Sequence, residues 1–139
     1  MNKKFFIAWI AVFVVWFAGS YVVHGVLLHG DYAQLSNLFR SEEESMHYFH
    51  WMIVAQVMMS GALTWIYSRG IESGSWVGQG IRFGIAVALL TTVPTYIVYY
   101  VVEPLPGSTV VRQIVFDGLL TLIIGLVVAF VYRGQPAKS

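Results

Sequence analysis

The pattern of apolar and polar residues divides the chain into four long apolar segments separated by short polar ones. These segments cover residues 5–28, 46–68, 81–102 and 110–132. An α-helix rises about 1.5 Å per residue, so each segment can cross the roughly 30 Å hydrocarbon core of a bilayer. The pattern predicts an all-α integral membrane protein, with residues 1–139 forming a single transmembrane domain. We expect two helical hairpins packed as a four-helix bundle.

The second apolar segment has the clearest boundaries. Ser41 followed by Glu44 matches a capping box, and residues 42–44 place three glutamates at the positive end of a helix dipole. The helix is therefore expected to begin in water at Glu42 and to end at the cationic residue Arg69.

The first segment begins like a secretory signal, but its apolar run continues to Leu28, which is too long for one. We interpret it as a retained signal anchor. In the following residues 29–40, four apolar side chains recur at helical spacing, namely Tyr32, Leu35, Leu38 and Phe39. This spacing predicts a short helix on the membrane surface. The alternative is an ordinary loop with apolar anchors.

The last two segments carry signals for a kink and for close packing. Pro94 is expected to kink the third helix, with Thr91 and Thr92 helping to satisfy the backbone there. Small residues recur every four positions before it, which lets two backbones approach closely in lipid. The stripe consists of Gly80, Gly84, Ala88 and Thr92, and a second consists of Gly118, Gly125 and Ala129. We expect both stripes to serve contacts within the chain, the alternative being a partner protein.

Composition narrows the classes of function. Hydrophobic residues make up 58% of the chain and charged residues 11%, a profile typical of membrane proteins. A net charge of +1 provides no field for binding nucleic acid. The chain has no cysteine, which excludes disulfides and thiolate metal sites.

Lysine and arginine counts predict the orientation of the spans. With both termini in the cytoplasm, six cationic residues lie on the cytoplasmic side and two, Arg40 and Arg112, lie outside. The six are Lys3, Lys4, Arg69, Arg82, Arg133 and Lys138. The four histidines and Glu103 then face the extracytoplasmic side, and Arg112 is expected to extend to the lipid headgroups.

Few polar side chains are expected at membrane depth, and they collect in the extracytoplasmic half. They are His24, His50, Gln56 and Asp117. A charge in hydrocarbon costs at least about 2.5–3.5 kcal/mol, so Asp117 is expected to be paired, protonated or functional. Its expected structural partners are His24, Gln56 or a tyrosine hydroxyl. The alternative is a protonatable relay residue.

A metal site is one interpretation of the same residues. Glu43, His47 and His50 share one helix face, and His24 and Asp117 are expected at a similar depth, with His29 and Glu103 nearby. Imidazole and carboxylate suit a transition metal, and two histidines could hold haem between the first two helices. The alternatives are interfacial histidines among lipid headgroups and a proton path.

Four short motifs suggest a family resemblance that covers almost the whole chain. They are residues 24–28 (HGVLL), 80–84 (GIRFG), 104–107 (PLPG) and 132–133 (YR). In these motifs the chain resembles small bacterial four-helix membrane proteins of unknown function. The resemblance implies four spans in a bacterial inner membrane, and it assigns no site residues.

Three functions are compatible with these features. The first is a small non-catalytic accessory subunit that packs against a larger membrane complex, such as an electron-transfer assembly, or against a second copy of itself. The second is a metal- or haem-binding protein that uses the histidine and carboxylate cluster. The third is a small proton- or ion-coupled transporter.

Overall fold

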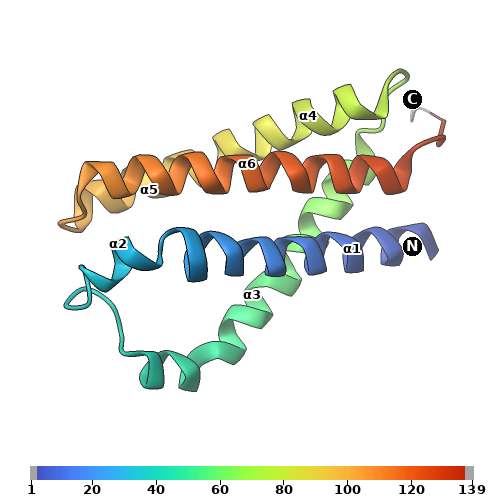
Figure 1. The fold of residues 1–139 in the computed structure, drawn as a ribbon. Coiled ribbons are helices and arrows are strands. Elements are labelled where there is room, and N and C mark those ends of the chain that lie inside the picture. Colours follow the sequence, from blue (N-terminus) through green and yellow to red (C-terminus); the bar gives the residue numbers. More distant parts are fainter. Residues whose placement is uncertain (1–2, 137–139) are drawn as a thin grey trace.

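The computed structural model describes residues 3–136, which contain four helical spans long and apolar enough to cross a membrane (Figure 1). There is no strand among these residues, so the all-α prediction is confirmed. Two spans are single helices, α3 (Glu42–Arg69) and α6 (Gly107–Tyr132). The first span joins α1 (Lys3–Ser20) to a π-helical segment, η1 (Tyr21–Leu27). The third joins α4 (Trp76–Val87), a π-helical segment η2 (Ala88–Thr92) and α5 (Val93–Val102).

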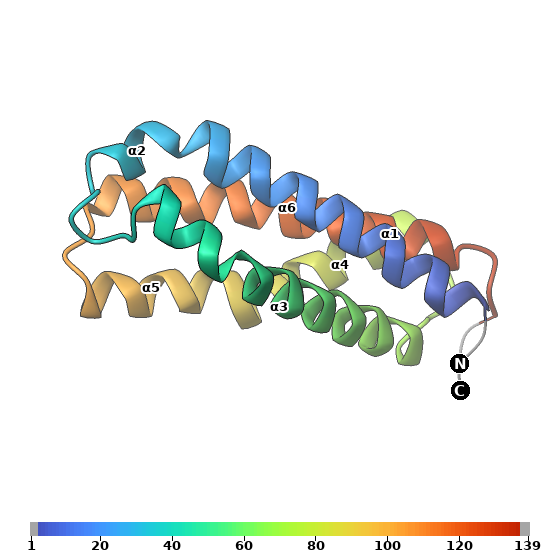
Figure 2. The same ribbon diagram turned by 90° about the horizontal axis from the view of Figure 1, so that it is seen from below.

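The start of α1 and the end of α6 lie at the same end of the molecule (Figures 1 and 2). We call this the termini end. The opposite end contains α2 (His29–Ala33), the start of α3 and the turn between α5 and α6. We call it the histidine end, because His24, His29, His47 and His50 all belong to the segments that meet there.

The boundaries of α3 agree with the sequence prediction. The Ser41 side chain accepts a hydrogen bond from the backbone N–H of Glu44 at 3.2 Å, and the helix runs from Glu42 to Arg69. Only this half of the capping box forms. The Glu44 carboxylate instead accepts a hydrogen bond from Arg40 at 2.8 Å.

The third span begins earlier than expected, at Trp76 rather than near Ile81. The cause is Gln79, whose side chain forms two hydrogen bonds with the backbone of Glu72, at 2.8 and 3.1 Å. These bonds fold the loop onto the first turn of α4. The fourth span likewise begins at Gly107, where the Pro106 carbonyl accepts hydrogen bonds from the backbone of the first turn.

The segment between the first two spans is helical for only five residues, His29–Ala33. The remainder continues in turns, with backbone bonds from Leu35 to Tyr32 and from Leu38 to Leu35. The expected short helix therefore covers only the first part of residues 29–40, and the loop alternative describes the rest.

Glycines bring α4 and α6 into direct backbone contact, as the small-residue stripe predicted. A Cβ on Gly80 would lie 2.9 Å from the Gly125 carbonyl oxygen, and a Cβ on Gly84 would lie 2.8 Å from the Leu122 Cα. The stripe therefore serves the chain itself. Gly118 is the exception, since a Cβ there would meet nothing within 4 Å.

The two halves of α3 differ in their packing. Its second half, residues 56–69, contributes Leu63 and Tyr67 to the apolar core formed with α1 and α6. Trp9 of α1 holds it there, because the indole N–H donates to the Val57 carbonyl at 3.0 Å and to Ser60 at 3.1 Å.

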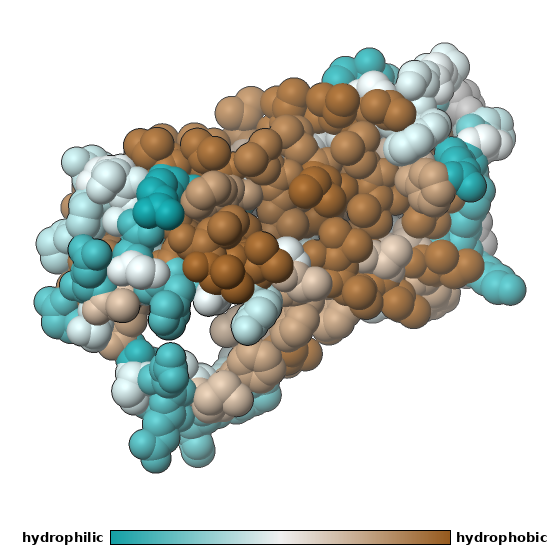
Figure 3. Space-filling model, in the orientation of Figure 1, coloured by the Kyte–Doolittle hydropathy of each residue, from teal (hydrophilic) through white to brown (hydrophobic). Residues whose placement is uncertain are grey.

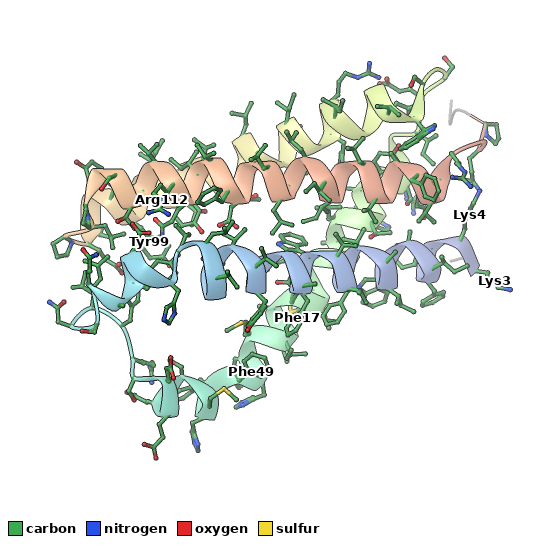
Figure 4. The ribbon with its side chains drawn as sticks, viewed as in Figure 1. Lys3, Lys4, Phe17, Phe49, Tyr99 and Arg112 are labelled. Atoms are coloured by element: carbon green, nitrogen blue, oxygen red, sulfur yellow. The ribbon has the colours of Figure 1, made fainter. Side chains whose placement is uncertain are left out.

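Beyond this crossing α3 turns away from α1 (Figure 1). An edge contact between Phe17 and Phe49, with ring centroids 6.2 Å apart, lies where the two helices separate (Figure 4). The first half of α3, residues 42–55, contains no buried residue. The four spans therefore do not pack against one another along their whole length.

Candidate functional site

Asp117 is the centre of a polar network at the histidine end. Its Oδ2 atom lies 3.2 Å from Nε2 of His24 and accepts a hydrogen bond from the Tyr96 hydroxyl. The Asp117 side chain is 15% exposed and that of His24 is 36% exposed. The pairing of Asp117 with His24 and a tyrosine hydroxyl agrees with the sequence interpretation, whereas Gln56 is not one of its hydrogen-bond partners.

The two π-helical segments lie next to this network in the chain. His24 belongs to η1, where the backbone N–H of Leu28 bonds to the Val23 carbonyl five residues back, at 2.9 Å. Such widened turns are frequent at functional sites. The second segment, η2, directly precedes Val93 and Pro94, at the kink predicted from the proline.

Threonines tie η2 and the Asp117 turn together. Thr121 donates to the Asp117 carbonyl at 2.7 Å and lies 3.3 Å from the hydroxyl of Thr92. Thr91 donates to the Val87 carbonyl at 2.8 Å, three residues before the Leu90 carbonyl that Pro94 leaves without its N–H. The backbone that carries Asp117 is thereby connected to the span that carries Tyr96.

The network continues from His24 to α2 and back to α6. Nδ1 of His24 lies 2.8 Å from the Tyr32 hydroxyl, and the Gln113 side-chain N–H donates to that hydroxyl at 3.1 Å. With a neutral imidazole, one proton arrangement satisfies every bond. The Gln113 amide donates to Tyr32, Tyr32 donates to Nδ1 of His24, and the Nε2 proton of His24 faces Asp117.

An ion pair holds α2 against α6. Arg112 lies 2.7 Å from the Asp31 carboxylate and donates to the Leu27 carbonyl at 3.1 Å. Thr109 also donates to Asp31, at 3.4 Å. The expectation that Arg112 extends to lipid headgroups is therefore corrected, because its guanidinium is engaged within the chain. This clamp positions Tyr32, which directly follows Asp31.

The environment of Tyr32 changes its acidity. Burial raises the pKa of the Tyr32 hydroxyl above its ordinary value, because the phenolate is poorly solvated there. The Gln113 hydrogen bond partly lowers this pKa, while the charges of Asp117 and Asp31 raise it further. The hydroxyl therefore stays protonated at neutral pH and remains able to donate to His24.

A cleft of about 340 Å³ lies beside the network, between α2, α5 and α6. Tyr32, Tyr96 and Gln113 belong to both the network and the cleft. The remaining lining residues are Phe39, Tyr99, Glu103 and Leu105. Tyr99 and Arg112 lie at the same end of the molecule in Figure 4. The network therefore borders on a space large enough for a small ligand.

The structure divides the residues predicted to bind a metal. It brings His24 and Asp117 together, but it places Glu43, His47 and His50 on the exposed first half of α3. The ring of His47 contacts Tyr48 and that of His50 contacts Trp51. Within residues 3–136 no group of three or more histidine, cysteine or acidic side chains could hold a metal ion. Metal or haem ligation stays a prediction.

Four members of the site were not singled out from the sequence, namely Asp31, Tyr32, Tyr96 and Gln113. For Tyr96 and Gln113 a signal was present. Both lie near the turn at residues 103–107, so counting helical turns from it places them close to the depth of Asp117. Asp31 and Tyr32 lie in a short segment whose path depends on contacts with α6, 78 and 81 residues away.

The side chains at the centre of the site come from distant parts of the chain. His24, Tyr96 and Asp117 come from three different spans, so their meeting is a property of the fold rather than of a local motif. No protein-family model, curated protein or solved structure matches the chain.

Proposed function

We propose that the chain is a small non-catalytic integral membrane protein that acts by association, as an accessory subunit of a larger membrane assembly. The observation that carries the proposal is the first half of α3. None of residues 42–55 is buried, whereas six residues of the second half are. A partner in the membrane would pack against this first half.

Membrane helices associate mainly through close packing. Lipid tails are as apolar as the helix surface, so the hydrophobic effect contributes little to helix association. Two other contacts of the chain are close, a backbone contact between α4 and α6 and an indole hydrogen bond between α1 and α3. The first half of α3 departs from this rule while presenting large side chains such as Met46, Trp51 and Met52. It is therefore a surface suited to a partner helix.

The surface of the molecule has open spaces next to α3, as expected if a neighbouring helix is missing there. In Figure 3 a gap opens between the start of α3 and the rest of the histidine end. Further along, an apolar cleft of about 320 Å³ involves α1, α3 and the third span, with Trp16, Met59 and Leu90 among its lining residues. A partner helix on α3 would complete the bundle expected from the sequence.

We further propose a bacterial inner membrane as the location, with both termini in the cytoplasm. The excess of lysine and arginine at the termini end supports this orientation. Lys3, Lys4, Arg69, Arg82 and Arg133 belong to that end, and Lys138 lies outside the described residues. The histidine end would then face the extracytoplasmic side.

Photo-crosslinking in living cells tests the accessory role. A benzophenone amino acid replaces Met52 in the first half of α3, and the control replaces Val101 of α5; these residues are 56% and 79% exposed. We expect a discrete protein adduct from position 52 and none from position 101. An adduct of twice the mass of the chain would identify the partner as a second copy. Adducts from neither position would contradict the proposal.

A proton- or ion-coupled transporter is the second candidate, favoured by the contact between Asp117 and His24 within the spans. Proton flux into vesicles containing the purified protein tests it. Asp117→Asn should abolish the flux, and Glu43→Gln, which changes an exposed carboxylate on α3, should not. Equal flux in wild type and Asp117→Asn would remove Asp117 from the mechanism.

A further inference from the structure

The cleft between α2, α5 and α6 has walls that suit a small cation. Four aromatic rings line it, those of Tyr32, Phe39, Tyr96 and Tyr99. Ring faces carry negative partial charge and attract cations, most strongly where water is partly excluded. Among the described residues that line the cleft, Glu103 is the one with a formal charge at neutral pH. The chemistry of the walls thus favours a positively charged ligand.

Glu103 is placed to meet such a ligand. It follows the last residue of α5, and the carbonyl groups at that helix end add negative partial charge. No hydrogen bond or ion pair within residues 3–136 occupies its carboxylate. The cation nearest in sequence, Arg112, is bound to Asp31. The negative charge of Glu103 is therefore not compensated within the described part of the chain.

Gln113 indicates which kind of cation fits. Its side chain lines the cleft and the residue is 6% exposed, with its amide N–H donating to Tyr32. Its amide oxygen is buried and accepts no hydrogen bond within residues 3–136. An unpaired buried acceptor is unfavourable until a donor reaches it. A ligand that carries N–H groups would supply that donor once the amide turns its oxygen toward the cleft, and a quaternary ammonium would not.

We propose that this cleft binds a primary ammonium group. The Glu103 carboxylate and the Gln113 amide oxygen accept its N–H donors, and the four aromatic residues line the space beside it. The ammonium belongs either to a free amine or to the headgroup of an amine-bearing phospholipid. This binding does not depend on a partner at α3, so the two proposals stand or fall separately.

Calorimetric titration of the purified full-length protein in a nonionic detergent tests the proposal. Butylamine is the first probe, and butyltrimethylammonium has the same charge without N–H donors. We expect the quaternary probe to bind about tenfold more weakly, or more, the effect of losing charge-assisted hydrogen bonds. Equal affinity for the two probes would overturn the proposal, as would an absence of butylamine binding to the folded protein.

Variants locate the binding. Glu103→Gln keeps the shape of the side chain and should weaken butylamine binding about tenfold or more. Glu43→Gln removes a carboxylate outside the cleft and should leave it unchanged. Gln113→Met should reduce the preference for butylamine over the quaternary probe. Thermal unfolding of each variant confirms that it is folded, and equal affinities of the two glutamate variants would contradict the assignment.

Short-chain phospholipids distinguish the two sources of the ammonium group. Dihexanoyl phosphatidylethanolamine carries a primary ammonium, and dihexanoyl phosphatidylcholine carries a quaternary one. Tighter binding of the ethanolamine lipid than of butylamine would identify a lipid headgroup as the ligand. Binding of butylamine alone would identify a free amine. Preferential binding of the choline lipid would overturn the role of Gln113.

Discussion

At the residue scale, the polar side chains around Asp117 are stabilised by one another. Asp117 is bound by His24 and Tyr96, and Tyr32 links His24 to Gln113. A carboxylate in a low-dielectric setting is costly unless hydrogen-bond donors surround it. The network therefore makes an acidic residue in α6 compatible with a membrane, whatever further role it has.

The Tyr32 hydroxyl should make the stability of the protein sensitive to alkaline pH. Burial raises the pKa of Tyr32 in the folded state, so the folded state favours the protonated form. This stabilisation is fully present below the ordinary tyrosine pKa of about 10 and is lost as the pH rises toward the raised value. Between pH 9 and pH 11, the thermal unfolding midpoint of Tyr32→Phe should fall less than that of wild type.

Tyr21 provides the control for this experiment, because it is a neighbouring tyrosine that is 69% exposed. Tyr21→Phe should keep the wild-type decrease between the two pH values. If Tyr32→Phe loses as much stability as wild type over this range, the buried hydroxyl does not contribute to the alkaline transition.

At the element scale, the contact between α4 and α6 is set by the absence of side chains. Gly80 and Gly84 bring one backbone against the other, and any side chain at these positions would collide with main-chain atoms that cannot rotate away. Close approach increases dispersion contacts, which distinguish a helix neighbour from lipid. This pair of helices is therefore the most closely joined part of the molecule.

Gly84→Val should lower the stability of the protein by about 1–3 kcal/mol, the usual cost of overpacking. A Cβ at this position would lie 2.8 Å from the Leu122 Cα and 3.0 Å from the Thr121 carbonyl oxygen. Gly118→Val is the matched control, since it makes the same change in α6 where a Cβ meets nothing within 4 Å. Thermal unfolding in detergent should separate the two variants, and equal midpoints would contradict the packing argument.

Local signals predicted the elements better than they predicted the site. The start of α3 depends on Ser41 and Glu44, which are neighbours in sequence, and it was predicted correctly. The glycine stripe of α4 also repeats locally, although the participation of Gly118 was predicted wrongly. The separation of α3 from α1 and the Asp31–Arg112 clamp depend on contacts between distant segments. The periodicity of one segment does not predict which distant segment it will contact.

At the scale of the whole molecule, packing is uneven from one helix to the next. The first, third and fourth spans lie alongside one another, while α3 crosses α1 and leaves it at the histidine end (Figures 1 and 2). The polar network occupies the well-packed side of that end and the exposed half of α3 occupies the other. The two features can therefore serve different ligands without competing for the same surface.

The orientation proposed for the molecule can be measured directly, because the chain has no cysteine of its own. A single cysteine at exposed Ser45 or exposed Ser75 samples the histidine end or the termini end. A membrane-impermeant maleimide applied to intact cells or spheroplasts should label Ser45→Cys, and Ser75→Cys should be labelled only after permeabilisation. The reverse pattern would place both termini outside the cytoplasm.

With a neutral His24, the hydrogen bonds from Gln113 through Tyr32 to His24 run in one direction, and this direction has a consequence. Each donor in the series depends on the one after it accepting, so the dipoles are aligned. A second proton on His24 would turn its Nδ1 from an acceptor into a donor. The Tyr32 oxygen would then accept from both His24 and Gln113, and its own O–H would be released from the series. Tyr32 also lines the cleft, so one proton at Asp117's partner would turn an engaged hydroxyl into a free donor on the cleft wall.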